Sequence, residues 1–308
     1  MRTIEYLSDP LLRGHLLPPL VAALALAICG SLLSVLVVLK RMSFIGQGVS
    51  HSAFGGVGLA ALLSGLISGG LSPVAQYAVV LVFCAGAALA VATLGDRKSL
   101  GMDTAIGVLL VSSMALGAVL LSIASRMARS GGTSPPIQGW ESILFGSILG
   151  VGWADAAVAC GVSATVCLAI GWWRRPLLLW AFDEAAAPAF GVPVARMKLT
   201  LVLLLAATIV TGMKVAGVVL ATALLVLPGA AAIAISRRLL PVFVCSVAVG
   251  VVGLLGGMIL SFERGWPTGA CIVLVLTVIV ALAWVVGRAR SVRARPGQGP
   301  AVNPLESA

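Results

Sequence analysis

The fold of this chain is decided by residues 39–59, LKRMSFIGQGVSHSAFGGVGL. A basic pair, Lys40 and Arg41, ends one long apolar segment, and the next segment carries Gln47 and His51. These two polar residues are four apart, so a helix would place both on one face. His51 is ten residues past Arg41, or ~15 Å along a helix axis, near the midplane of a hydrocarbon core ~30 Å thick. An ionisable side chain at that depth is a candidate functional residue, and the alternative is a histidine that bonds a neighbouring helix for packing.

The composition excludes a soluble domain. Of the 308 residues, 60% are hydrophobic and 10% are charged, whereas a soluble domain averages ~25% charged residues. With a mean hydropathy of +1.13, we expect an all-α, polytopic integral membrane helical bundle. The net charge of +10 does not indicate a nucleic-acid partner, because the basic residues gather in short loops and at the C-terminus. That distribution is the one that sets membrane orientation.

Apolar stretches of about bilayer length recur along the chain. They cover residues 17–39, 45–67, 74–94, 103–123, 154–173, 199–212, 215–235, 240–260 and 268–287. The short stretch 199–212 is divided from 215–235 only near Thr211–Lys214, so this pair forms either two tilted spans or a broken, re-entrant element. We expect eight or nine spans, in three regions: a tail or interfacial helix at 1–16, a membrane permease domain at 17–287, and a basic, disordered cytoplasmic tail at 288–308.

The basic residues predict the orientation. With the C-terminus inside, fourteen of the 20 lysines and arginines fall on the cytoplasmic side. They are Lys40, Arg41, Arg97, Lys98, Arg174, Arg175, Arg196, Lys198, Arg237, Arg238, Arg288, Arg290, Arg293 and Arg295. Four fall on the opposite side, namely Arg126, Arg129, Lys214 and Arg264. The bias predicts a multi-pass protein of the plasma (inner) membrane with a cytoplasmic C-terminus, and nine spans would leave the N-terminus outside.

Two loops are longer than a connection requires. The outer loop, 124–153, contains a half-apolar run at 140–151 that could dip back into the membrane where protein covers its backbone. The inner loop, 174–198, has an acidic start and an alanine run at 183–190, which suits a short helix along the cytoplasmic face. Pro193 then ends that helix before the next span.

Few residues in the spans can carry chemistry. Neither a GxSxG elbow nor an HExxH pair is present, so an enzyme is disfavoured. One imidazole, one amide a turn away and several small residues suit a narrow path for a cation, and neutral imidazole binds divalent first-row metals. The chain has no GxxxxGK[ST] motif, so ATP, if it drives transport, would bind a separate subunit.

Four blocks of sequence resemble the membrane permeases of ATP-binding-cassette importers for zinc, manganese and iron. The blocks follow one another in the family's order and are VVLKRMSFIGQGVSHSAFGGVGLAALL (37–63), ESILFGSILGV (141–151), AFDEAAAPAFGVPVARMK (181–198) and TGMKVAGVVLATALLVLPGAAA (211–232). The resemblance implies a permease that dimerises in the plasma membrane, most simply as a homodimer. It also implies two cytoplasmic ATP-binding subunits and an extracytoplasmic metal-binding protein as partners. No cofactor would be bound by this chain itself, and the transported ion would be zinc or manganese.

The resemblance also assigns roles to residues. The stretch 183–192 would be the helix that contacts the ATPase, with Asp183, Glu184, Phe190 and Gly191 in the contact. His51 and Gln47 would line the metal path, although the family usually has an aspartate where this chain has Gln47, and a neutral amide attracts a divalent cation less than a carboxylate does.

Four further residues receive predicted roles. Glu141 in the outer loop could restore a negative charge near the entrance to the path. Pro228 and Gly229 interrupt helical hydrogen bonding and supply a kink that a gate could use. Lys214 would repel a metal, so we expect it to cap the C-terminal end of the element at 199–212.

Two other functional classes are alternatives. An ion-gradient-driven secondary transporter of a cationic substrate would require carboxylates in the middle of spans, and the predicted spans have none there. A purely structural membrane protein would not need a polar pair at midplane depth.

Overall fold

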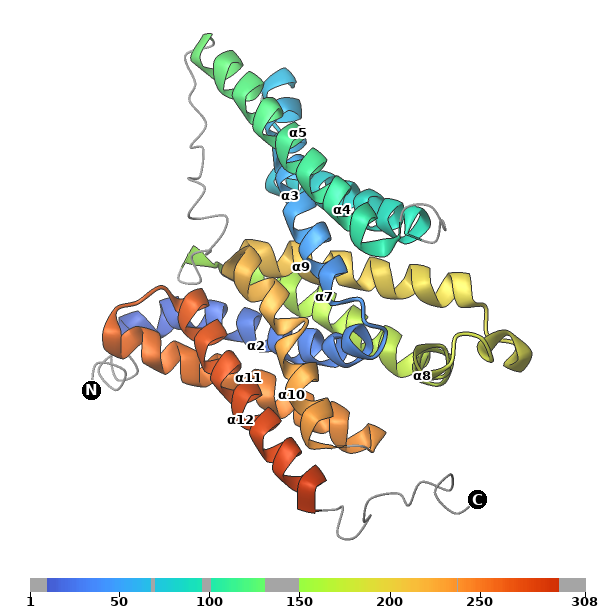
Figure 1. Cartoon of the computed structure of the whole chain (residues 1–308). Coiled ribbons are helices and arrows are strands. Elements are labelled where there is room, and N and C mark those ends of the chain that lie inside the picture. The colour runs from blue at the N-terminus through green and yellow to red at the C-terminus, as the bar shows by residue number, and fades with distance from the viewer. Residues whose placement is uncertain (1–9, 68–69, 96–100, 131–149, 237, 294–308) are drawn as a thin grey trace, which may run out of the picture.

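The computed structural model describes residues 10–67, 70–95, 101–130, 150–236 and 238–293, and nearly all of these are helical. The helices are α2 (Pro10–Leu39), α3 (Ser43–Leu66), α4 (Pro73–Leu94), α5 (Met102–Ser130), α7 (Trp153–Trp172), α8 (Arg174–Phe182), α9 (Val194–Leu224), α10 (Leu227–Ile235), α11 (Leu239–Arg264) and α12 (Thr268–Arg293), with the 3-10 helix η2 (Ala187–Phe190) before α9 (Figure 1). Within these ranges, 8 segments are long and apolar enough to span a membrane. The all-α, multi-span prediction is confirmed.

The predicted spans agree with the helices to within a few residues at most ends, and the inner loop differs. Residues 174–182, expected to be a connector, form α8. The helix predicted at 183–190 is instead a turn followed by η2, which has only 4 residues. The half-apolar run predicted at 140–151, including Glu141, lies outside the described residues except for its last two positions.

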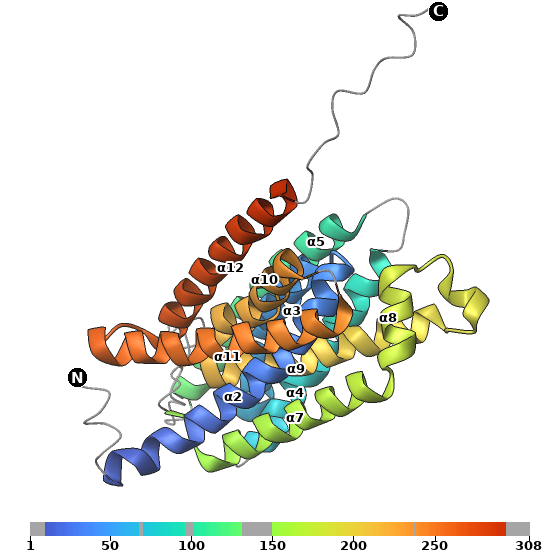
Figure 2. The ribbon, with the colours of Figure 1, turned by 90° about the horizontal axis from the view of Figure 1, so that it is seen from below.

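One end of the bundle carries α8, η2 and the start of α9, on the right in Figures 1 and 2. The turn between α2 and α3 lies at the same end, because Lys40 in that turn bonds to Trp180 of α8. We call this the α8 end. The other end carries the start of α7 and the reversal in α9 described next.

The helix α9 folds back on itself at Gly217. This residue has φ 84° and ψ 164°, a conformation that is essentially confined to glycine. A Cβ on Gly212 would lie 2.9 Å from the Cβ of Ala221, whereas nine residues of straight helix would separate the two by ~13 Å. The break predicted at Thr211–Lys214 is therefore misplaced, because those residues are helical and the reversal requires the positive φ of Gly217.

The arm that follows Gly217 returns beside α2. A Cβ on Gly30 would lie 3.4 Å from the Cβ of Leu224, and a Cβ on Gly229 would lie 2.6 Å from the backbone of Ser34. These contacts progress along α2 towards its C-terminal end, so the return arm runs back to the α8 end. The segment thus has two arms that run in opposite directions, which is closer to the predicted pair of tilted spans, although Val194–Ile235 makes up a single one of the 8 candidate spans.

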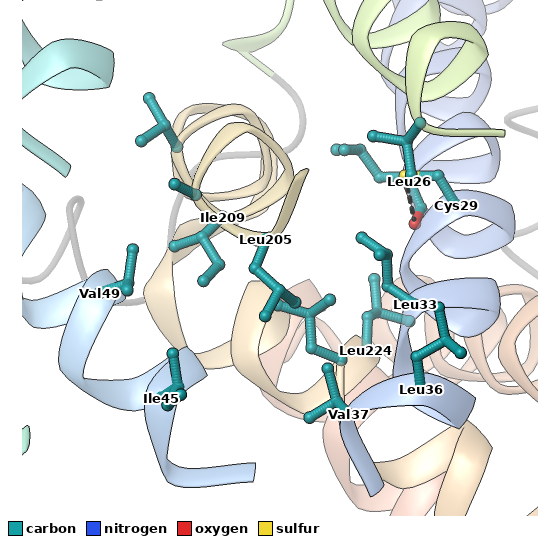
Figure 3. Packing of buried hydrophobic residues seen from close by; sticks show 14 of the residues in the cluster. Leu26, Cys29, Leu33, Leu36, Val37, Ile45, Val49, Leu205, Ile209 and Leu224 are labelled. Carbon is teal, nitrogen blue, oxygen red and sulfur yellow. Dashed lines mark hydrogen bonds between the residues drawn. The ribbon is translucent and has the colours of Figure 1, made fainter. Parts of the chain in front are cut away.

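The core is formed where α9 lies between α2 and α3 (Figure 3). Leu205 and Ile209 of α9 face Val49 of α3 on one side and Leu33 and Val37 of α2 on the other. All five side chains are fully buried. Because lipid is as apolar as these residues, close packing rather than the hydrophobic effect holds such helices together.

Glycines bring α3 and α5 into direct backbone contact. A Cβ on Gly58 would lie 2.8 Å from the carbonyl oxygen of Gly117, and a Cβ on Gly117 would lie 2.5 Å from that of Phe54. A Cβ on Gly48 would lie 2.9 Å from the side chain of Ile106. Small residues allow this approach, and they explain why the glycine-rich stretch 39–59 determines how the helices pack.

The reversal at Gly217 can be tested by substitution. Gly217→Ala forces a Cβ into a glycine-only conformation and should cost about 1–3 kcal/mol of stability. The measurement is the unfolding temperature of the detergent-solubilised protein. Gly86→Ala is the matched control, because Gly86 is helical, exposed and has open space around it. Equal unfolding temperatures for the two variants would contradict the reversal.

Candidate functional site

The polar pair on α3 lies on a partly exposed face of the helix. Gln47 is exposed and His51 is half-buried. Phe44, one turn before Gln47, is 65% exposed. The rest of this part of α3 is buried against α5, α4 and α9. We call residues 44, 47 and 51 the Gln47–His51 face, and it occupies the half of α3 nearer the α8 end.

The imidazole of His51 has an unused polar atom. Its Nδ1 is buried and has no hydrogen-bond partner, and its ring stacks on Phe54 with centroids 6.3 Å apart and planes 17° apart. Buried polar atoms are nearly always hydrogen-bonded, because leaving one unsatisfied is costly. The packing alternative, a histidine bonded to a neighbouring helix, therefore has no support at Nδ1.

The described residues contain no group of three or more His, Cys, Asp and Glu side chains that could hold a metal. An imidazole and an amide from one helix supply two ligands, fewer than the four of a structural zinc site. A transport path must bind its ion weakly enough to release it, so a small ligand set is compatible with passage. Glu141, the predicted third member, lies outside the described residues.

The segment from Asp183 to Gly191, which we call the coupling segment, is shaped by its own backbone. Asp183 Oδ1 accepts a hydrogen bond from the Ala186 N–H at 2.9 Å. Gly191, with φ 73°, donates to carbonyls of η2. Phe190 is 70% exposed at the tip. The side chains of Asp183 and Glu184, two of the four residues predicted to contact the ATPase, have partners within the chain, namely the Ala186 N–H and Lys40. Phe190, the third, projects outward.

The turn between α2 and α3 has three residues and a defined geometry. Arg41 has φ 55°, the Met42 N–H bonds the Val37 carbonyl at 2.9 Å, and the Arg41 N–H bonds the Val38 carbonyl at 3.1 Å. This is the Schellman motif, which usually has glycine in the left-handed position. Met42 and Val37 are both buried in the core, so they supply the hydrophobic contact that accompanies the motif. The turn is therefore held by two hydrogen bonds and one hydrophobic contact.

Lys214 lies three residues before the reversal at Gly217, near the C-terminal end of the first arm of α9, where the sequence prediction placed it. Its Nζ is 2.6 Å from Asp155 Oδ1 in the first turn of α7. The Nζ is also 5.9 Å from the ring centroid of Tyr77, whose hydroxyl is 2.6 Å from the Thr211 hydroxyl. These contacts join α4, α7 and α9 at the end opposite the α8 end. No sequence pattern marks them, because the partners are far apart in the chain.

Pro228 and Gly229 follow an interruption in the helix. The break lies at Leu225 and Val226, and Pro228 occupies the first turn of α10, where a missing N–H costs least. Gly229 allows the close approach to Ser34 of α2. Their use as a gate stays a prediction.

The family model for the ABC 3 transport family matches residues 14–287. The chain belongs to the ABC 3 transport family. It is 31% identical over 302 residues to the manganese transport system membrane protein MntC of Halalkalibacterium halodurans, covering 97% of both chains. It is 31% identical over 286 residues to a probable iron transport system membrane protein of Haemophilus influenzae, covering 91% of this chain and 97% of that one.

A solved structure agrees. The chain superposes on PsaBC from Streptococcus pneumoniae with a TM-score of 0.76 and 25% identity, covering 95% of this chain and 98% of that one. The predicted resemblance to importer permeases is confirmed at the level of family and fold.

The cap at Asp183 yields a prediction for the coupling segment. Asp183→Ala removes the acceptor for the Ala186 N–H and should loosen the segment, because losing such a cap typically costs ~1 kcal/mol. Chymotryptic cleavage after the exposed Phe190 should then become faster. Asp183→Asn keeps an oxygen acceptor and should cleave at nearly the original rate. If alanine and asparagine leave the cleavage rate equal, the cap does not hold the segment.

Proposed function

We propose that this protein is the membrane permease of an ATP-driven importer of a divalent metal, with manganese or iron as the cargo. The observation that carries the proposal is the near full-length match to a manganese transport membrane protein, supported by a relative named for iron transport. Zinc, expected from the sequence as an equal candidate, has less support, because those relatives are named for manganese and iron.

The α8 end faces the cytoplasm in this proposal. The basic residues of the α2–α3 turn, α8 and the start of α9 support that orientation, which also puts the C-terminus of the chain inside. A separate ATP-binding subunit docks there, because the chain has no P-loop. The exposed Phe190 is the best-placed contact residue. An extracytoplasmic metal-binding protein delivers the ion at the other end.

A second copy of the chain completes the metal path. An amide and an imidazole at this depth are costly against lipid and belong against protein or in a water-filled cavity. Two-fold symmetry would bring the Gln47–His51 faces of two copies together, which doubles the ligands to two imidazoles and two amides. Imidazole nitrogen suits divalent first-row metals, and amide oxygen suits manganese. Alternating access would move this face between the two sides, with the break before Pro228 as a hinge.

A secondary transporter is not favoured. Proton or sodium coupling requires ionisable groups within spans. In the described part of the chain the carboxylates of the long helices, Asp103, Asp155 and Glu263, all lie in terminal turns.

Replacement of the histidine tests the path directly. His51→Ala removes the imidazole and should abolish metal-dependent growth rescue and Mn²⁺ uptake, while the protein still reaches the membrane. His15→Ala, at the chain's other histidine, is the control and should transport normally. Normal uptake by His51→Ala would overturn the assignment of this face to the path.

Replacement of the glutamine tests the departure from the family pattern. Gln47→Asp adds a charged oxygen ligand and should lower the KM for Mn²⁺ by about threefold or more, because carboxylates bind divalent cations better than amides do. The maximal rate should fall if release becomes limiting. Gln47→Asn keeps a neutral amide and should leave the KM closer to that of the unmodified protein. An unchanged KM in Gln47→Asp would show that position 47 does not contact the ion.

A further inference from the structure

The side chain of Lys40 connects the α2–α3 turn to the coupling segment. Its Nζ lies 2.6 Å from Glu184 Oε2 and donates to the Trp180 carbonyl at 3.2 Å. The same Nζ lies 4.2 Å from the ring centroid of Trp180. One ammonium group therefore contacts α8 and the coupling segment at the same time, from a turn more than a hundred residues earlier in the chain.

The partial burial of Lys40 distinguishes it from a lysine that serves only to set the membrane orientation. Its side chain is 11% exposed, whereas that of Glu184 is 55% exposed. A lysine that only sets the orientation of the protein in the membrane keeps its charge in water. A lysine that is largely removed from water needs a partner for its charge, because desolvation is costly. Trp180, the other partner, is 1% exposed. Lys40 thus lies between a fixed core residue and a residue of the exposed coupling segment.

The α2–α3 turn joins Lys40 directly to the start of α3. Lys40 precedes Arg41 in the Schellman motif, and only two residues separate Lys40 from Ser43, the first residue of α3. The motif has no flexible linker in which a movement could be absorbed. Gln47 and His51 lie four and eight residues further on, or ~6 and ~12 Å along the helix axis.

We propose that Lys40 is a positioning residue that transmits movement of the coupling segment to α3, and so to the Gln47–His51 face. This rests on the proposed function, in which the coupling segment moves when the ATPase subunits bind ATP. Movement of Glu184 pulls or releases the ammonium group, and α3 shifts with the turn. Binding of the ATPase itself would use Phe190 and does not require Lys40.

The test is made on the complex of permease and ATPase in lipid vesicles. A nitroxide on Leu66→Cys, in a background without the six native cysteines, reports on α3 from a position that is 61% exposed and lies outside the Gln47–His51 face. With Lys40 intact, trapping the ATPase with ATP and vanadate should change the nitroxide spectrum. Lys40→Met keeps the packing on Trp180 but removes the charge, and should abolish most of that change. Lys40→Arg keeps the charge and should restore it.

Transport is measured in parallel. In Lys40→Met the ATPase should stay assembled and hydrolyse ATP, while the Mn²⁺ moved per ATP falls about tenfold, within the usual range for coupling between sites. Glu184→Gln should give a smaller loss, because the amide oxygen of glutamine can still accept a hydrogen bond from the Lys40 ammonium group. A purely structural role would lower the unfolding temperature, hydrolysis and uptake together and leave the ratio of uptake to hydrolysis unchanged.

The possible results distinguish a failure of the role of Lys40 from a failure of the proposed cargo. A full spectral change in Lys40→Met, an unchanged ratio of Mn²⁺ to ATP in that variant, or the lack of any ATP-dependent change with Lys40 intact would each overturn the role of Lys40. If α3 responds to ATP through Lys40 while the intact complex moves neither Mn²⁺ nor Fe²⁺ nor Zn²⁺, the proposed cargo is wrong and the role of Lys40 stands.

Discussion

The backbone contact between α3 and α5 is the constraint on which the arrangement of the polar face depends. Gly58 and Gly117 let the two helices approach until any added Cβ would meet a carbonyl oxygen. This contact fixes which side of α3 is buried, since one side is pressed against α5 and another against α4 and α9. The side that remains carries Gln47 and His51. The glycines therefore determine where the polar pair points without contacting it.

The spans could be predicted from the sequence because bilayer thickness sets a minimum apolar length, and the basic residues mark the loops between them. The reversal in α9 was harder to locate. A polar run at Thr211–Lys214 indicated a break, but Lys214 is accommodated in the helix by Asp155 of α7. The reversal instead occurs at Gly217, where the necessary backbone conformation leaves no polar signal in the sequence.

The candidate site was predictable only as far as local spacing determines it. Residues four apart share a helix face, which is enough to pair Gln47 with His51. The partners of the coupling segment were not predictable, because Lys40 and Glu184 are 144 positions apart. Their contact depends on how α2, α3 and α8 pack. Asp183 and Glu184, taken from the sequence as contacts to another subunit, both have partners within this chain.

In the proposed function, imported metal passes the Gln47–His51 face. Anomalous X-ray diffraction from crystals of the dimeric permease complex grown with Mn²⁺ tests it most directly. We expect an anomalous peak within ligand distance of the His51 imidazole, between the two copies of α3. A peak elsewhere in the membrane domain, with none at His51 in crystals of a complex that transports Mn²⁺, would contradict it.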